Sequence, residues 1–284
     1  RNVVITSENA NVGGLVGDLV EGCSLRRCSA EGNVTGNSQV GGLLGSPYNG
    51  NTITESYSEG TVTGNHIAGG FTGASVVGFP GTTNSTIENC YSRANVTVFN
   101  GMAGGFIGSF SALLEVNNSY STGTAVGPEF IGGFIGAAGG VISNNNFWDA
   151  ETSLLSNAVG EWIGGNPGTP DITARNTIEM KTTEFLDLLN EGGTVWKLNS
   201  TENDGYPFFS VDVVATNNIG SINSNVVIYP NVFDTEINID SEKALKNYAI
   251  YAISGKEIQA GSLEGKQALV NIAGIHSGIY VLII

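Results

Sequence analysis

The acidic side chains that recur at a regular spacing are the first candidates for chemistry. Glu31 and Glu59 lie at equivalent places 28 residues apart, and Glu55 and Glu88 lie near them. Two carboxylates stacked in this way could hold calcium or form the acid–base pair of a glycosidase. A solvated acidic edge explains them more simply, and the acidic turn at 201–205 lacks the EF-hand spacing. We therefore predict no cofactor, with calcium as a weak alternative.

Groups that commonly carry acid–base or nucleophilic catalysis are sparse. The chain has two histidines, His66 and His276, and each is expected in a turn. No HExxH, CxxC, GxSxG or Walker motif occurs. The sequence therefore predicts a chain that is not an enzyme.

Tyrosines also recur at one place in the sequence pattern. Tyr57, Tyr91 and Tyr120 each precede a serine in similar segments. Exposed rings can stack on sugars, so these three are candidate ligand contacts; an aromatic ladder packed on or within the wall of the fold is the alternative that we favour. Alternation counted from the apolar start of each segment turns the rings inward, and alternation counted from the small residue before them turns them outward. The sequence leaves their exposure open.

Composition excludes several classes of protein. The net charge is −15 with only 11 Lys and Arg, so no nucleic-acid partner is expected. Charged residues make up 13% and glycine 41 of 284 residues, which is typical of β-rich extracellular proteins. No apolar stretch is long enough for a membrane span. No signal peptide is recognisable, and the abrupt start at Arg1 indicates a fragment or a processed form.

A tandem repeat must position these residues. Five apolar-Gly-Gly-apolar-X-Gly blocks align, and their first glycines, Gly13, Gly41, Gly69, Gly104 and Gly132, are spaced by 28, 28, 35 and 28 residues. The long interval contains a loop insertion around 76–85. Each repeat offers three strand-like segments separated by Gly, Asn and Ser. The pattern predicts an all-β fold, a right-handed three-sided parallel β-helix over residues 1–150, with coils stacked about 4.8 Å apart.

Equivalent residues should form ladders along the coil axis. We expect four inward apolar ladders: Val12/Val40/Ala68/Ala103/Ile131, Leu15/Leu43/Phe71/Phe106/Phe134, Leu25/Ile53/Ile87/Val116/Ile142 and Val34/Val62/Val96/Ala125. Cys28, Ser56, Cys90 and Ser119 form a ladder of small residues. The paired glycines are expected at corners, where positive φ and close approach of coils are needed.

The cysteines are too few for a disulfide framework. Cys28 and Cys90 would lie two coils, roughly 9–10 Å, apart, which is too far for a disulfide. Cys23 and Cys28 could pair across a turn, but we expect buried free thiols.

Beyond the repeat, three further regions follow. Residues 151–215 contain Trp and other aromatics and one predicted helix, Thr177–Asn190, with Thr182 or Thr183 as its cap and Gly192 past its end. This region is expected to cap the open coil. Residues 216–223 form a polar linker, and residues 224–284 are expected to form a small antiparallel β-sandwich.

The glycine blocks, together with segments such as Ile87-Glu-Asn-Cys-Tyr-Ser, resemble the GLUG repeat of bacterial surface proteins over about residues 10–150. The resemblance implies a secreted or cell-surface bacterial protein. Such repeats occur in adhesins and in accessory regions of surface proteases.

The tail resembles the C-terminal sorting domain of type IX secretion in Bacteroidetes. The residues that carry this resemblance are Tyr229, Pro230 and Asn231, then Gly255 and Lys256, then Gly278 and Tyr280. It implies the type IX secretion machinery as a partner.

These observations together predict a non-catalytic cell-surface adhesin or structural display module that binds an extracellular glycan or protein through the faces of the solenoid. Two alternatives stay open, a carbohydrate-active β-helix enzyme and an accessory region of a larger surface protease.

Overall fold

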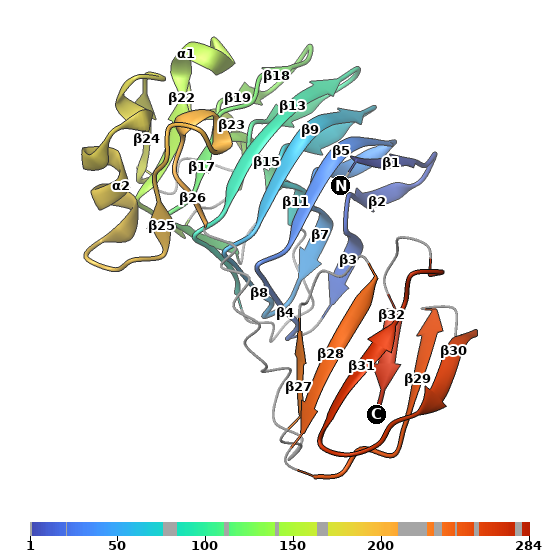
Figure 1. Cartoon of the computed structure of the whole chain (residues 1–284). Helices are drawn as coiled ribbons and strands as arrows, with labels where there is room; N and C mark the ends of the chain where they lie inside the picture. Colours follow the sequence, from blue (N-terminus) through green and yellow to red (C-terminus); the bar gives the residue numbers. More distant parts are fainter. Residues whose placement is uncertain are drawn as a thin grey trace. The chain divides into compact units, whose positions relative to one another are not determined.

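The computed structural model describes residues 2–20, 22–75, 84–110, 114–139, 142–163, 170–209, 226–229, 235–241, 243–252, 256–275 and 280–284. The chain divides into two compact units, residues 1–210 and residues 211–284. The first unit is built from stacked parallel coils and the second from antiparallel strands (Figure 1). No helix among the described residues is long and apolar enough to cross a membrane.

The coils of the first unit form four parallel sheets, here named A to D, which the chain visits in turn. Sheet A contains β1 (Asn2–Thr6), β5 (Ser29–Gly36), β9 (Tyr57–Gly64), β13 (Tyr91–Val98), β17 (Tyr120–Ser121), β18 (Ala125–Val126), β22 (Asn146–Asp149) and β24 (Ile172–Arg175). Sheet B contains β2 (Ala10–Gly13), β6 (Ser38–Gly41), β10 (Ile67–Gly69), β14 (Met102–Gly104) and β19 (Ile131–Gly132). Sheet C contains β3 (Val16–Val20), β7 (Leu44–Tyr48), β11 (Thr72–Ser75), β15 (Ile107–Phe110), β20 (Ile135–Ala138) and β23 (Val159–Trp162). Sheet D contains β4 (Ser24–Arg26), β8 (Thr52–Thr54), β12 (Ser85–Glu88), β16 (Leu114–Asn117) and β21 (Ile142–Asn144).

The parallel β-solenoid is confirmed, but each coil has four strand segments where the sequence predicted three. The glycine block, expected as one segment, is divided between sheets B and C. A Cβ on Gly41 would collide with the carbonyl oxygen of Leu44, three residues later, so the chain bends sharply here. This bend adds the fourth segment.

Close approach, rather than a left-handed backbone, requires these glycines. A Cβ on Gly42 would collide with the carbonyl oxygen of Gly70 in the next coil. Among the described residues, the solenoid glycines with positive φ lie elsewhere, as at Gly32 (137°) and Gly60 (112°). The expected close approach is therefore confirmed, and the expected positive φ at the blocks is wrong.

Residues with side chains and a left-handed backbone conformation instead lie at the corner between sheets D and A in every coil. They are Arg27, Glu55, Asn89, Asn118 and Asn145, with φ of 55°, 48°, 52°, 48° and 54°. Asn tolerates this conformation better than most residues with a side chain. In the first two coils the corner carries Arg27 and Glu55, whose side chains form an ion pair of 2.6 Å.

Stacked phenylalanines fill the centre of the solenoid. The rings of Phe71 and Phe106 are 4.8 Å apart and nearly parallel, and those of Phe106 and Phe134 are 4.7 Å apart. Leu43 continues this ladder and is fully buried. Leu15 was expected inside with them, but it is 39% exposed because it lies in the first coil, with no coil over its outer side.

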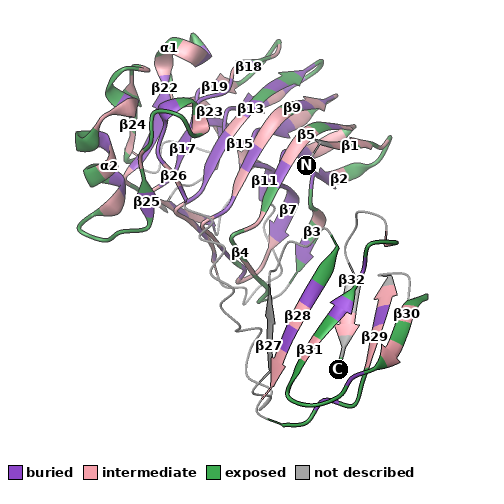
Figure 2. Cartoon of the chain, viewed as in Figure 1, coloured by how far each residue is buried: buried purple, intermediate pink, exposed green. Residues whose placement is uncertain are grey.

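The other predicted inward ladders are buried with few exceptions. Figure 2 shows buried positions alternating with half-buried or exposed ones along the strands of sheet A. Buried members are Val12, Val40, Ala68, Ala103, Ile53, Ile87, Val116, Val34, Val62, Val96 and Ala125. Leu25 and Ile131 are half-buried. The side chain of Ile142 lies outside the described residues.

The fifth repeat is aligned one residue differently from the sequence prediction. Ser143, not Ile142, pairs with Val116, and Phe147 pairs with Tyr120. Asn146 therefore joins the ladder of small residues, where its Oδ1 accepts a hydrogen bond of 3.0 Å from the Ser119 backbone N–H. The extra residue between the apolar start and the aromatic position explains the shift.

All three cysteines are free. Cys90 is buried as expected and Cys28 is half-buried, but Cys23 is exposed. The expectation of a buried thiol is therefore wrong for Cys23, which lies in the first coil, like the exposed Leu15.

Parallel pairing continues beyond the predicted boundary at residue 150. β23 pairs with β20, and β24 pairs with β22. Directly after β22 and before both of these strands lies α1 (Ala150–Ser153), whose first N–H groups are capped by the Asp149 carboxylate. The predicted boundary is therefore too early, because an incomplete further coil without a glycine block extends the sheets to Arg175.

The predicted helix 177–190 is divided by its own cap residue. η1 (Glu179–Lys181) is a 3₁₀ turn and α2 (Thr183–Asn190) is α-helical. Thr182 between them is extended, and its hydroxyl accepts a 3.2 Å hydrogen bond from the Phe185 N–H. The region continues with β25 (Trp196–Lys197), the turn η2 (Asn203–Gly205) and β26 (Phe208–Phe209).

The second unit contains two three-stranded antiparallel sheets, as expected for a small β-sandwich. One sheet is β27 (Val226–Tyr229), β28 (Glu236–Ser241) and β31 (Gln267–Asn271); the other is β30 (Glu257–Ser262), β29 (Asn247–Ala252) and β32 (Tyr280–Ile283). Ile237, Ile239, Ile250 and Val270 are among the buried residues of this unit.

The sorting-type residues of the tail are described in part. Tyr229 ends β27, Tyr280 begins β32, and Lys256 is exposed directly before β30. Pro230, Asn231, Gly255, Gly278 and His276 lie outside the described residues. The predicted linker 216–223 also lies outside them.

One inward position holds a polar group that we expect to destabilise the fold. Thr72 pairs with Leu44 and Ile107 in sheet C and is fully buried, and among the described residues its hydroxyl has no hydrogen-bond partner. Thr72→Val keeps the shape and removes the unsatisfied group. We expect it to raise the free energy of unfolding by about 1–3 kcal/mol in urea titrations.

Ser58→Ala is the matched control for this variant. The Ser58 hydroxyl donates a 2.7 Å hydrogen bond to the carbonyl oxygen of Gly70, so its loss should destabilise by about 1 kcal/mol. A Thr72→Val variant less stable than the parent chain would contradict the prediction.

Candidate functional site

The tyrosine ladder points outward from sheet A. Tyr57 and Tyr91 stack with ring centroids 4.7 Å apart, and Tyr91 and Tyr120 with centroids 5.2 Å apart. Cys90, directly before Tyr91, faces the core. The left-handed corner at Asn89 resets the alternation between Ile87, which also faces the core, and Tyr91. This bend resolves the two assignments that the sequence left open.

Residues 176–209 cover most of this ladder; we call them the cover. Its Phe185, Trp196 and Phe209 pack against the tyrosines, and the Trp196 indole N–H donates to Asn89 Oδ1 at 3.1 Å. Residues 151–215 were expected to close the open coil. Within this region β23 and β24 stack on the last coil, whereas the cover packs on the outer face of sheet A.

Trp148 occupies the position that closes the interior of the fifth coil. It takes the place held by Ser121 in the coil before and is buried beside Gly133. Its indole N–H donates to the carbonyl oxygen of Leu155 at 3.2 Å. The large ring ends the sequence repeat here, since a further regular coil would need a small residue at this place.

The candidate ligand contacts are therefore unequally placed. Tyr120 is fully buried and Tyr91 is 3% exposed, so neither ring is accessible for stacking on a sugar. Tyr57 is half-buried at the edge of the cover. The alternative that we favoured, an aromatic ladder packed on the wall, describes Tyr91 and Tyr120.

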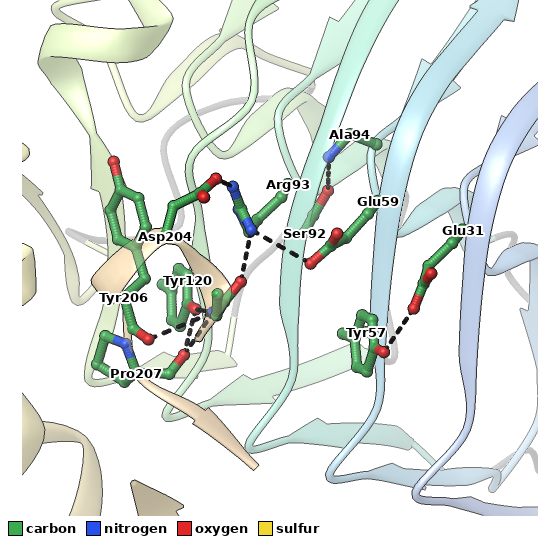
Figure 3. A network of polar contacts seen from close by, with 11 residues as sticks. Glu31, Tyr57, Glu59, Ser92, Arg93, Ala94, Tyr120, Asp204, Tyr206 and Pro207 are labelled. Carbon is green, nitrogen blue, oxygen red and sulfur yellow. Dashed lines mark hydrogen bonds and ion pairs between the residues drawn. The ribbon is translucent and has the colours of Figure 1, made fainter. Parts of the chain in front are cut away.

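A polar network fixes the cover to sheet A (Figure 3). Arg93 donates to Asn203 Oδ1 at 2.8 Å, forms an ion pair with Asp204, and lies 3.4 Å from a carboxylate oxygen of Glu59. The Asn203 amide donates to the Tyr120 hydroxyl and to the Pro207 carbonyl, both at 2.9 Å. The acidic turn flagged as a weak calcium signal thus holds the guanidinium of Arg93.

The positions of the described side chains do not support a metal site. Among the described residues, no group of three or more His, Cys, Asp or Glu side chains lies close enough to hold an ion. Glu55 is engaged at a corner by Arg26 and Arg27, with N–O distances of 2.6 Å. His66 is exposed, and its Nδ1 lies 3.3 Å from the Asn100 carbonyl oxygen.

The stacked carboxylates Glu31 and Glu59 pair in register, and their environments move their pKa values in opposite directions. A hydrogen bond of 2.7 Å from the Tyr57 hydroxyl lowers the pKa of Glu31. Burial raises the pKa of Glu59 against the opposing charge of Arg93. Burial, together with the Glu31 hydrogen bond, raises the pKa of Tyr57 to about 12.

Beyond the cover and the column that contains Glu31 and Glu59, the outer face of sheet A carries uncharged side chains, most of them polar. Val4 and Val126, which pair with Asn33 and Thr97, are exposed apolar exceptions. Two columns of side chains lie there, Asn33, Thr61, Asn95 and Thr124 in one and Thr35, Thr63 and Thr97 in the other; we call them the Asn/Thr array. All seven are exposed or half-buried. The array contains no titratable group and was not among the candidate sites predicted from the sequence, although the repeated Asn-Val-Thr and Thr-Val-Thr triplets signal it.

Comparison with known families agrees with this architecture, a parallel β-solenoid followed by an antiparallel β-sandwich. The family model described as the GLUG motif matches residues 8–35, the first of the five repeats. The model described as the secretion system C-terminal sorting domain matches residues 227–284. No curated protein and no solved structure matches the chain.

The chain therefore contains a GLUG motif and a type IX sorting domain, in agreement with the resemblance seen in the sequence. It is a secreted or cell-surface protein.

The buried hydroxyl of Tyr120 should contribute measurably to docking of the cover. It donates to the Pro207 carbonyl and accepts from Asn203, so Tyr120→Phe leaves the buried carbonyl of Pro207 and the half-buried amide of Asn203 with one partner fewer. We expect a loss of about 1–3 kcal/mol in the free energy of unfolding, followed by tryptophan fluorescence.

Tyr91→Phe is the matched control, since among the described residues its hydroxyl makes no hydrogen bond. Its effect should stay within about 0.5 kcal/mol. Equal losses in the two variants would show that the polar network does not hold the cover.

Tyr57→Phe should make stability depend differently on pH. The folded-state pKa of Glu31 is lowered below its unfolded value of about 4.3. Its contribution to stability is therefore present above that value and is lost as pH falls through the folded pKa. The parent chain should exceed Tyr57→Phe in Tm at pH 7, and the difference should shrink below about pH 4. A difference that does not change with pH would refute this role for the hydrogen bond.

Proposed function

We propose that the chain is a non-catalytic surface adhesin or display module that binds an extracellular glycan or protein through the outer faces of its solenoid. The observation that carries the proposal is the Asn/Thr array, which repeats from coil to coil and stays accessible beside the cover. Regularly spaced hydroxyl and amide groups on rigid strands suit recognition of an extended ligand, because little side-chain entropy is lost on binding.

The sorting domain supports this proposal from an independent direction. Delivery to the cell surface or the medium places the solenoid where extracellular ligands occur. The type IX secretion machinery of Bacteroidetes is the partner that we propose for export.

The full chain, labelled at the exposed thiol of Cys23, should bind specific features on glycan and extracellular-matrix arrays. The same chain unfolded by heat is the control, and it should lose the specific signals. Arrays that remain blank with folded protein at micromolar concentration would refute the proposal.

Glu31 and Glu59 favour a second candidate, a carbohydrate-active enzyme. Two adjacent carboxyl groups whose pKa values move apart are the arrangement that a glycosidase uses for its acid and its nucleophile. Arg93 contacts the Glu59 carboxylate and the Tyr57 hydroxyl donates to the Glu31 carboxylate. Each carboxylate therefore already has a partner within the protein, which favours a structural role. Release of reducing ends from a polysaccharide by the parent chain would favour the enzyme.

A further inference from the structure

The Asn/Thr array is in register from coil to coil. Asn33, Thr61 and Asn95 pair directly across β5, β9 and β13, as do Thr35, Thr63 and Thr97. The residues between the two columns, Val34, Val62 and Val96, are buried in the core, so the array points outward throughout. Equivalent groups therefore recur about every 4.8 Å along the coil axis.

Hydrogen bonds within the array fix the orientation of its amides. Thr61 Oγ1 donates to Asn33 Oδ1 at 2.8 Å, and Thr124 donates to Asn95 Oδ1 through both its hydroxyl and its backbone N–H at 3.0 Å. In the described part of the chain, neither Asn33 Nδ2 nor Asn95 Nδ2 donates a hydrogen bond. Two oriented donors are thus held two coils, about 10 Å, apart.

The array is neutral within a strongly acidic protein. None of its seven residues is ionisable, whereas the chain carries a net charge of −15. The neighbouring column on sheet A contains Glu31 and Glu59, with Arg93 already paired to Glu59 and Asp204. An anionic polymer would therefore be repelled, and an uncharged ligand rich in hydroxyl groups is complementary to this surface.

An exposed aromatic ring borders the array. Phe99 lies directly after β13, two residues beyond Thr97, and is 64% exposed. Beside it, Asn100 donates to Asn65 Oδ1 at 2.7 Å, and Asn65 donates to Asn37 Oδ1 at 3.1 Å, so a ladder of amides runs along the same edge. A solvent-exposed ring next to oriented amides offers an apolar contact for the face of a sugar.

We propose that the array binds a neutral, extended polysaccharide of 1,4-linked β-hexopyranose units, lying along the coil axis. In such a chain every second sugar presents the same edge, so like hydroxyl groups recur at a repeat comparable to the spacing of the two asparagines. The asparagine amides donate to these hydroxyls, the threonine hydroxyls bind the intervening sugars, and Phe99 contacts the apolar face of one ring. The inference rests on the proposed function and assigns its site and ligand class.

Affinity electrophoresis of the full chain in gels containing soluble xyloglucan, galactomannan or polygalacturonate tests the proposal. Retardation is expected with at least one of the two neutral polymers and not with the acidic one. Phe99→Ala and Thr97→Val should each weaken binding to the retarding polymer, Phe99→Ala by about tenfold. Neither side chain makes a hydrogen bond in the described part of the chain, so both variants should keep the Tm of the parent.

Thr52→Val is the matched control, because Thr52 is an exposed threonine on sheet D, away from the array. It should bind like the parent chain. Binding that is unchanged in the Phe99 and Thr97 variants would overturn the assignment of the face while leaving the proposed function intact.

Three further outcomes would overturn the ligand class. These are stronger retardation by polygalacturonate, no retardation by either neutral polymer at saturating concentration, and inhibition of ice recrystallisation without polysaccharide binding. The last would mean that the array orders water rather than sugar. Specific signals on the extracellular-matrix arrays, without retardation by any polysaccharide, would show that this inference fails while the proposed function stands.

Discussion

The close stacking of successive coils through the glycine blocks is the constraint on which the rest of the first unit depends. In each glycine-block coil after the first, the carbonyl oxygen of the residue after the glycine pair accepts two backbone N–H groups from the coil before it; Phe106, for example, accepts from Phe71 and Thr72 at 2.8 and 3.1 Å. Any side chain at Gly42 would push the coils apart and break this shared acceptor. The glycines are thus required by the backbone hydrogen bonds that hold the stack together.

Once the coils are in register, chemically equivalent residues meet along the axis, and each ladder acquires a collective property. Phenylalanines stack in the core, and serines such as Ser58 satisfy glycine carbonyl oxygens from within. A single residue that differs in type from the rest of its ladder therefore has a large effect. Thr72 leaves a hydroxyl without a partner among apolar neighbours, and Trp148 ends the regular stack by filling a place where other coils have a small residue.

The outer face of sheet A is divided between two uses. Its aromatic half is buried beneath the cover, which Arg93, Asn203 and Tyr120 fix through buried and half-buried polar contacts. Its Asn/Thr half stays accessible and uncharged. Covering the tyrosines removes an apolar patch that would otherwise promote aggregation of a secreted protein, and it leaves the polar half as the surface on which recognition can act.

The sequence by itself determined the architecture, because a repeat with a fixed period makes equivalent residues neighbours in space. From it followed the parallel coils, the buried ladders such as Val34, Val62 and Val96, and the resemblance of the tail to a sorting domain. Only the tertiary structure decided the fourth strand of each coil, the outward direction of Tyr91 and the extension of the sheets to Arg175. The direction of Tyr91 depends on a left-handed corner at Asn89, which changes the alternation within a segment without altering its pattern of apolar residues. The burial of Tyr120 depends on residues such as Phe185 and Asn203, more than 60 positions away, and no local period encodes a contact of that separation.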